Sequence, residues 1–453
     1  MSVQPPHVVV VGAGVAGLAA TGELRRHGAA VTVLEREPEP GGRVRTVELE
    51  GVPVNLGTQF VASFCTETVA ALRAGGLGAD LVPDRERSAV VAGGRAHRID
   101  SPAALIAGGL LSVPSRLRLP GLALPLLAAW PRLDSSDLTA AAPFDRRPAI
   151  DLVRRWAGEE VACRAIGPIV RGLLYWDLET TSQGVLLTML RAAASGASVF
   201  RVRGGMRRVA ETLAGGLDVR LGTTVTGLAH GAGGRAAVTV ADADGERVLE
   251  CDGVVCATTA GPAAQLLADA PSETLGFLRS TSYSRTTIVV VRVPSGVPLP
   301  HTSLLFPTDT VRSLASVNPP RLDAGPGRAR FVRISLSDEA HAAMAGLDGE
   351  GLTQAALALV REAGAGGEWT ERATPAHALR WEEALPRFPA GRLRAEGMLR
   401  PDRIDYGRVA LAGDYLRAPH VEGALLSGRA AAGRLLRVLR SVPTPPRPRP
   451  RPA

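Results

Sequence analysis

The chain has 453 residues, of which 45% are hydrophobic and 21% charged, so its composition excludes a disordered protein and favours two or three packed domains. All 52 basic residues are arginines, which excludes any mechanism that needs a lysine, such as Schiff-base formation. The net charge of +8 is not accompanied by clustered arginine and aromatic residues or by a zinc or helix-turn-helix pattern, so we expect no nucleic-acid partner.

The spacing of the cysteines and the length of the apolar runs indicate the cellular compartment of the protein. The four cysteines show no C-x-x-C spacing, so we expect reduced thiols and no metal site. No run reaches the ~18 apolar residues of a membrane span, and the first residues do not follow the pattern of a signal peptide. We therefore expect a cytoplasmic protein.

The first 35 residues predict a strand, a glycine turn, a helix and a second strand. His7–Val11 contains four consecutive valines, as in a parallel strand covered on both faces. A helix is predicted over Val15–His27, and Ala30–Leu34 is predicted to be the second strand. Between the first strand and the helix lies a G-x-G-x-x-G motif, Gly12–Gly17, at the place where Rossmann-type folds bind a dinucleotide.

Each part of this motif has a physical role in binding a dinucleotide. Gly12 permits the tight turn, Gly14 lets a pyrophosphate approach the backbone, and Gly17 lets the helix pack closely on the strand. The free N–H groups and the dipole at the helix start attract phosphate. Glu35 ends the second strand, where a carboxylate accepts hydrogen bonds from ribose hydroxyls.

The rest of the chain alternates between helical and strand-rich regions. A helical segment is predicted over 151–174, and strands return over 217–258. Thr286–Val293 and Arg330–Leu336 predict a second, mostly antiparallel sheet. A strand over 408–412 and a helix over 423–439 then close the fold before a tail of alternating proline and arginine.

The sequence therefore predicts a mixed α/β fold, in which a Rossmann-type dinucleotide-binding domain is interleaved with a substrate domain of antiparallel sheet plus helices. The dinucleotide-binding segments are expected at residues 1–97, 204–270 and 401–440. The substrate domain is expected to comprise a helical part, 98–203, and a sheet, 271–400. The tail, 441–453, is expected to be disordered.

Several later segments carry further recognisable motifs. Gly41-Gly42-Arg43, followed by Thr46, resembles the G-G-R-x-x-T segment that runs beside the flavin in the flavin amine oxidase / protoporphyrinogen oxidase superfamily. Asn55–Gln59 resembles the turn that follows it, and Gly204–Met206 resembles its G-G-M segment. The stretch from Gly413 to Gly428 resembles the closing motif, in which a carboxylate binds the ribityl chain and a helix N-terminus faces the flavin pyrimidine.

This resemblance implies a non-covalently bound FAD, because no cysteine lies in the segment Trp381–Gly391 where covalent monoamine oxidases carry one. An arginine usual in the superfamily two residues after the ribose carboxylate is replaced by a glutamate, and Arg36 beside it is the substitute. The implied cofactor-binding residues are Gly12, Gly14, Val15, Ala16, Gly17, Glu35, Arg36, Gly41, Gly42, Arg43, Gly57, Thr58, Gln59, Val225, Gly413, Asp414, Val421, Glu422 and Ala424.

Two residues are candidates for contact with the reacting substrate. His420 stands where the amine oxidases usually carry a cage tyrosine, and its ordinary pKa suits a base near neutrality; the alternative is a packing role. Trp381 is expected either to line the flavin face or to belong to the core. The lysine that amine oxidases place near the flavin is absent.

The leading functional hypothesis is an FAD-dependent oxidoreductase that takes a hydride from a C–N or C–C bond of an apolar small molecule, with O2 as electron acceptor. The alternatives are a protoporphyrinogen-type oxidase, an isoprenoid desaturase and a non-redox flavin isomerase. The proline-broken apolar stretches within 103–131 favour a helical core around an apolar substrate tunnel; the alternative is a weak peripheral contact with a membrane.

Overall fold

A computed structural model describes residues 4–84, 87–230, 234–319, 329–398 and 406–441. Its first sheet contains five parallel strands from the start, the middle and the end of the chain, so the Rossmann-type domain is interleaved as predicted. In spatial order these strands are β10 (Val219–Arg220), β2 (Ala30–Leu34), β1 (His7–Val11), β14 (Gly253–Cys256) and β20 (Val409–Leu411).

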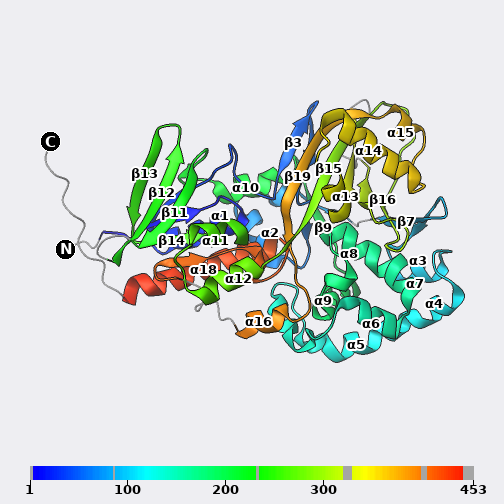
Figure 1. Cartoon of the computed structure of the whole chain (residues 1–453), viewed down its shortest axis with the longest axis horizontal. Helices are drawn as coiled ribbons and strands as arrows, with labels where there is room; N and C mark the ends of the chain where they lie inside the picture. Colours follow the sequence, from blue (N-terminus) through cyan, green and yellow to red (C-terminus); the bar gives the residue numbers. More distant parts are fainter. Residues whose placement is uncertain (1–3, 85–86, 231–233, 320–328, 399–405, 442–453) are drawn as a thin grey trace.

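Helices cover one face of this sheet, and a three-stranded antiparallel sheet packs on the other together with α11 (Ala260–Leu266) and α12 (Ser272–Ser280) (Figure 1). Helix α1 (Val15–Arg26) packs directly on helix α18 (Val421–Ser441). The two backbones approach so closely that a Cβ atom at Gly428 would lie 2.0 Å from the carbonyl oxygen of Ala16. This packing places the starts of both helices at the same edge of the sheet. The valines of β1 beneath them are buried, as in a parallel strand covered on both faces.

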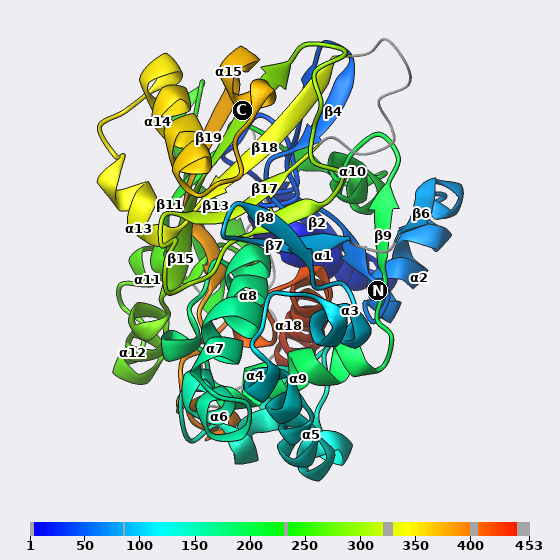
Figure 2. The same ribbon diagram turned by 90° about the vertical axis from the view of Figure 1, so that its right-hand side faces the viewer.

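The second domain is built on a seven-stranded sheet that is antiparallel except where β16 pairs with β7. Helices α13 (Asp338–Ala343), α14 (Gly349–Glu362) and α15 (Glu368–Arg372) cover its outer face (Figure 2). In spatial order the strands are β19 (Thr374–Pro386), β15 (Tyr283–Val293), β18 (Arg330–Leu336), β17 (Leu314–Asn318), β16 (Ser303–Leu305), β7 (Ser88–Ala92) and β8 (Arg95–Arg98).

The strands β7 and β8 correct one predicted boundary. The sequence assigned residues 1–97 to the dinucleotide-binding domain, but Ser88–Ala92 pairs with Ser303–Leu305 of the second sheet. The first dinucleotide-binding segment therefore ends before residue 88. The end of the predicted tail, 442–453, lies outside the described residues.

A helical layer completes the second domain beneath the sheet (Figure 2). The predicted helix over 151–174 is present as α6 (Ala149–Trp156), α7 (Glu159–Val161), a π-helical turn over 162–166 and α8 (Gly167–Leu174). Helix α8 packs on β16 and β17. At Gly172 an added Cβ would lie 2.4 Å from the side chain of Leu305, so any residue other than glycine would require Leu305 to move. Among the described residues, no helix has the length and apolarity to cross a membrane.

Candidate active site

A cavity of about 1660 Å³ lies where the two sheets and the helical layer meet. Its lining comes from the glycine turns and the start of α18 on one side, and from β18, β19 and α8 on the other. Ligand cavities commonly measure ~300–1,000 Å³, so this cavity has room for two molecules side by side. One part is built from the predicted dinucleotide motif, and the other is lined by the second domain.

The glycine turn after β1 leaves its backbone open to the cavity. Gly12 has a φ of +98°, a conformation that favours glycine, and a Cβ at Gly17 would lie only 1.9 Å from the carbonyl oxygen of Gly12. At Gly14 an added Cβ would meet no atom within 4 Å. No side chain in the described part of the chain caps the start of α1, so its N–H groups are free to bind an anion in the cavity.

Glu35 braces the same turn and also lines the cavity. Its Oε2 accepts a hydrogen bond from the backbone N–H of Ala13 at 2.7 Å, and its Oε1 accepts one from Glu37 at 2.9 Å. A carboxylate offers about four acceptor positions, so further positions are free for hydroxyl groups. The neighbouring Arg36 lies at the exposed rim, where its Nε is 3.3 Å from the Glu37 carboxylate.

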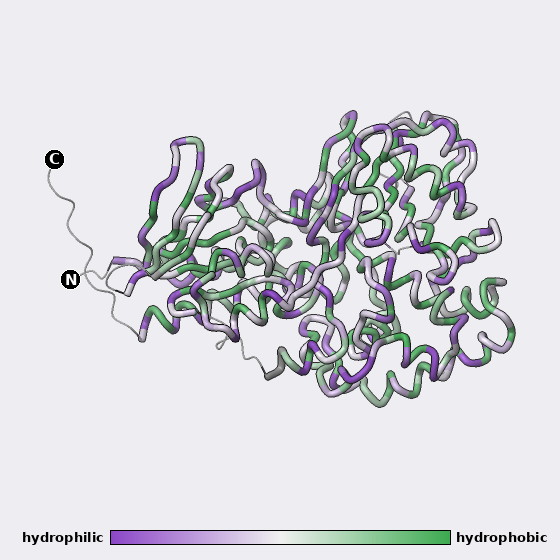
Figure 3. Tube along the Cα trace, viewed as in Figure 1, coloured by the Kyte–Doolittle hydropathy of each residue, from purple (hydrophilic) through white to green (hydrophobic). Residues whose placement is uncertain are grey.

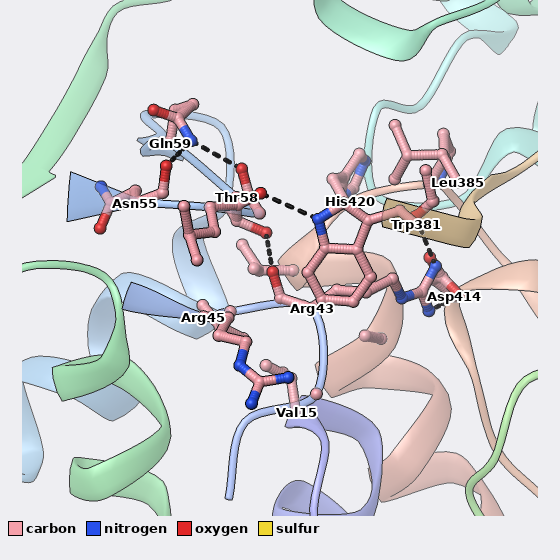
Figure 4. Close-up of a pocket in the computed structure, with 18 of the residues that line it drawn as sticks. Val15, Arg43, Arg45, Asn55, Thr58, Gln59, Trp381, Leu385, Asp414 and His420 are labelled. Carbon is pink, nitrogen blue, oxygen red and sulfur yellow. Dashed lines mark hydrogen bonds and ion pairs between the residues drawn. The ribbon is translucent and has the colours of Figure 1, made fainter. Parts of the chain in front are cut away.

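Arg43 and Asp414 connect the second glycine turn with the C-terminal segment (Figure 4). The Arg43 Nη2 donates to Asp414 Oδ1 at 2.7 Å, and its Nη1 donates to the carbonyl oxygen of Ala384 at 3.1 Å. Burial is the largest single influence and opposes the charge on Arg43, but the Asp414 carboxylate, together with Tyr283 and Glu383, raises the pKa of the guanidinium above its ordinary value. The guanidinium also lies 6.0 Å from the centre of the Tyr283 ring. Arg43 therefore remains a fixed cation at the wall of the cavity.

The turn predicted over Asn55–Gln59 lies against Arg43. The backbone N–H of Thr58 donates to the carbonyl oxygen of Arg43 at 3.0 Å. A Cβ at Gly57 would lie 2.0 Å from that oxygen, which explains the glycine. The Gln59 amide donates to the carbonyl oxygens of Asn55 and Gly57, so its side chain holds the turn together (Figure 4).

The start of α18 faces the cavity, but one of the residues predicted to bind the cofactor there points away from it. Gly413, Asp414, Val421 and Ala424 line the cavity. Glu422 does not: its buried carboxylate accepts hydrogen bonds from the backbone N–H groups of Glu67 and Thr68, at 2.9 and 2.8 Å, and from the Thr68 hydroxyl. The side chain of Glu422 thus stabilises the N-terminus of helix α2 (Thr66–Ala74).

His420 lines the cavity with both ring nitrogens engaged. Its Nε2 donates to the carbonyl oxygen of Ser135 at 2.7 Å, and its Nδ1 accepts from the backbone N–H of Gly423 at 3.2 Å. Burial lowers the pKa of His420 below its ordinary value, which keeps the imidazole neutral. These contacts favour the packing role over that of a base, because the lone pair of Nδ1 is already occupied.

Trp381 lies on β19 with its ring at the cavity wall. Its indole N–H donates to the carbonyl oxygen of Leu56 at 2.9 Å and therefore fixes the ring against the turn (Figure 4). The remaining predicted residues, Val15, Ala16, Gly41, Gly42 and Val225, also line the cavity. With the exception of Gly17 and the side chain of Glu422, the structure brings the predicted site residues together.

Sequence reasoning missed the polar groups on the far wall of the cavity, among them Tyr175, Asn318 and Arg333. Arg333 lies in the apolar strand β18. A charged residue in the middle of such a strand is the signal that was available. The partners of Arg333 come from separate segments, so the sequence does not group these residues.

Comparison with known proteins finds a family model that covers most of the chain. The sequence model described as flavin containing amine oxidoreductase matches residues 15–436. Polyamine oxidase 4 of Oryza sativa subsp. japonica is 39% identical over 78 residues, which are 17% of this chain and 16% of the relative, so this match spans about a sixth of either protein.

Two solved structures share the fold over 96% of the chain. Cyclohexylamine oxidase from Brevibacterium oxydans IH-35A is 21% identical, with 100% of its own chain covered and a TM-score of 0.72. The CLA-producing fatty acid isomerase from P. acnes is 14% identical, with 99% of its chain covered and a TM-score of 0.70.

Proposed function

The chain belongs to the flavin containing amine oxidoreductase family and uses FAD, and from this we propose that it oxidises a C–N or C–C bond of an apolar small molecule, with O2 as electron acceptor. When bound, FAD supplies the acceptor for the substrate hydride. The observation that carries this proposal is a cavity with room for both a dinucleotide and a second molecule, since its two parts have different linings.

The residues of the first part fit FAD. The open backbone at Gly14 and the uncapped start of α1 would hold the phosphates, and the free acceptor positions of Glu35 would hold the ribose. Arg43 and Asp414 would lie beside the remainder of the cofactor, with the N-terminus of α18 directed at it.

The state of Cys65 supports non-covalent binding. Among the described residues, Cys65 is the cysteine that lines the cavity. Burial, followed by the nearby Glu422 carboxylate, raises the pKa of its thiol to about 12. The thiol therefore stays protonated near neutral pH and lacks the nucleophilic thiolate needed for attachment.

The residues of the second part would position the substrate and exclude water. Trp381 and the apolar side chains of α8 form its walls, so a bound substrate loses its hydration shell there. His420 does not offer a free lone pair. We therefore favour substrates in which a nitrogen lone pair or conjugation assists the departure of the hydride.

Anaerobic mixing of the purified protein with amines, porphyrinogens and polyenes tests this proposal. We expect at least one class to bleach the flavin absorbance, and admission of air to restore it. Bleaching by porphyrinogens or polyenes alone would identify the corresponding alternative oxidase or desaturase. Turnover that requires a pre-reduced flavin, without net electron flow, would contradict the oxidase and identify an isomerase.

The role of His420 gives a prediction about pH. Because its pKa is lowered in the folded protein, the unfolded chain binds a proton below pH ~6.5 that the native state does not, so stability is lost as the pH falls below that value. His420→Ala should lower the free energy of unfolding by about 1 kcal/mol at pH 7.5, because the N-cap contact of α18 is lost, and should reduce the acid sensitivity.

Urea unfolding at pH 5.5 and 7.5 measures both effects, and His301→Ala, at an exposed histidine, is the matched control. In turnover assays the His420→Ala variant should keep the pH profile of the parent. Disappearance of an acidic limb from that profile would restore His420 as the base.

We also propose a weak peripheral membrane contact through the helical layer. Leu117 and Leu127 are 77% and 65% exposed, and Val113, Leu124 and Ile106 are exposed beside them in sequence. Figure 3 shows hydrophobic residues along α5 (Ala123–Ala129) at the lower edge of the view. An apolar surface flanked by arginines such as Arg118 suits an anionic lipid surface.

Sedimentation with vesicles of phosphatidylcholine and phosphatidylserine measures this contact. We expect the parent to bind, and the double variant Leu117→Ser, Leu127→Ser to bind at least fivefold more weakly. Leu221→Ser, which changes an exposed leucine of the other domain, is the control and should bind like the parent. Equal binding of the double variant and the control would contradict the proposal.

A further inference from the structure

Arg333 is a buried cation that points into the second part of the cavity. It lies on β18, where Val332, Ile334 and Leu336 pack against α14 on the outer face of the sheet. Because side chains alternate along a strand, Phe331 and Arg333 face the opposite side, and both line the cavity. The side chain is nevertheless shielded, since Arg333 is only 5% exposed.

The partners of Arg333 are all neutral. Its Nη2 donates to the Tyr175 hydroxyl at 2.8 Å, and its Nη1 donates to Asn318 Oδ1 at 3.2 Å. Its Nε has no hydrogen-bond partner among the described residues. Of the five other arginines that line the cavity, four pair with a carboxylate: Arg36, Arg43, Arg45 and Arg201. The fifth, Arg380, is only partly buried and donates to backbone carbonyl oxygens. Arg333 therefore has a buried charge without a counter-charge in the described part of the chain.

The neutral partners are themselves held in place. The Ser316 hydroxyl donates to Asn318 Oδ1 at 3.0 Å, and the Asn318 amide donates to Ser303 Oγ at 3.0 Å. Tyr175 follows α8 with a φ of +57°, a conformation that residues other than glycine rarely adopt. Such conformations persist where the surrounding structure enforces them, often at binding sites. The guanidinium is thus oriented before any ligand enters.

A buried guanidinium without an anion is unfavourable, and a carboxylate bound at Nε and Nη would supply the missing charge. We infer that Arg333, with Tyr175 and Asn318 as positioning residues, binds the carboxylate of an organic acid that is the substrate or occupies the substrate position. This inference rests on the proposed function, because it assigns the substrate class of the same cavity.

The sheet register indicates the length of this acid. Arg333 pairs with Val290 of β15, and Trp381 of β19 pairs with Thr286, so the two residues lie on the same face. They are two strands and four residues apart, which corresponds to about 16 Å. An acid held at Arg333 therefore needs an extended apolar body to reach the wall formed by Trp381, where the cavity meets the cofactor part.

Ligand titration of the FAD-loaded protein tests the inference, with flavin absorbance and thermal shift as readouts. Octanoate should bind at least tenfold more tightly than octanamide, which has the same shape without the charge, and at least tenfold more tightly than acetate. Equal binding of octanoate and octanamide would overturn the proposal. Such a result would leave the proposed oxidation intact if amines still bleach the flavin.

Variants then assign the effect to Arg333. Arg333→Gln should lose the preference for octanoate over octanamide, and Arg333→Lys should retain part of it, because the charge remains while the bidentate geometry is lost. Arg292→Gln, at an exposed arginine of the same sheet, should bind both ligands like the parent. If Arg333→Gln keeps the FAD and the full preference, the carboxylate binds elsewhere and the proposal is wrong.

Discussion

Replacement of Gly17 by alanine is expected to abolish FAD retention and to lower the free energy of unfolding by about 3 kcal/mol. The new Cβ would lie 1.9 Å from the carbonyl oxygen of Gly12 and 3.2 Å from Val10, so the start of α1 must move away from β1. That movement displaces the turn whose backbone faces the cavity. Urea unfolding and the flavin content of the purified protein measure the two effects.

Substitutions of two further glycines in the same segment distinguish the effect of a steric clash from the effect of weaker FAD binding. Gly14→Ala should fold like the parent, because its Cβ meets no atom, but should bind FAD at least tenfold more weakly where the phosphates approach. Gly22→Ala, in the middle of α1, should keep FAD and gain up to ~1 kcal/mol from helix propensity. If Gly14→Ala retained FAD as tightly as the parent, the phosphates would not lie at this turn.

The second large effect is expected from Asp414→Ala. This change leaves the Arg43 guanidinium at the cavity wall without its counter-charge, which should cost about 3 kcal/mol of stability and release FAD. Asp414→Asn keeps the shape and an acceptor for Arg43, so its loss should be smaller. Urea unfolding of both variants and of the parent measures the change in stability, and fluorescence titration measures FAD binding.

A surface ion pair provides the comparison. Glu368→Ala removes the partner of Arg372 on α15, where both side chains are about half exposed, and should cost at most ~0.5 kcal/mol. A cost for Asp414→Ala as small as that for Glu368→Ala, with FAD retained, would show that Arg43 and Asp414 do not hold the cofactor part of the cavity together.

The buried parallel sheet was the part of the fold that the sequence predicted best. The bounds of His7–Val11 and Ala30–Leu34 agree with the strands found, because continuous β-branched runs leave few alternatives to a covered strand. In the second, antiparallel sheet the bounds of Arg330–Leu336 also agree with the strand found. The strands β7 and β8, at one end of the second sheet, were missed as members of it. Their assignment depends on pairing with Ser303–Leu305, more than 200 residues away, which no local pattern contains.

At the closing motif, the sequence gives the position of each residue but not the direction of its side chain. Val421 and Ala424 lie about one turn apart on α18 and share the cavity face. Glu422 is rotated by about 100° from Val421, which directs its carboxylate to α2. The role of His420 depends in the same way on Ser135, a carbonyl group from a distant segment.

The partners of Arg333, in the part of the cavity proposed to bind the substrate, could not be predicted from the sequence either. Its cavity-facing orientation follows from strand alternation, but its lack of a counter-charge becomes visible only when α8, β17 and β18 are packed together. The cofactor motifs are continuous and local, whereas the substrate wall is assembled from three separate segments. This difference explains why the sequence predicted FAD-binding residues and left the substrate open.

The flavin content of the purified protein tests the central claim most directly. We predict a yellow protein with one FAD per chain, and complete release of that FAD into the supernatant on acid precipitation, because the Cys65 thiol is protonated and cannot attach it. A colourless protein that takes up no added FAD would contradict the account. Flavin that remains on the precipitate would contradict its non-covalent binding.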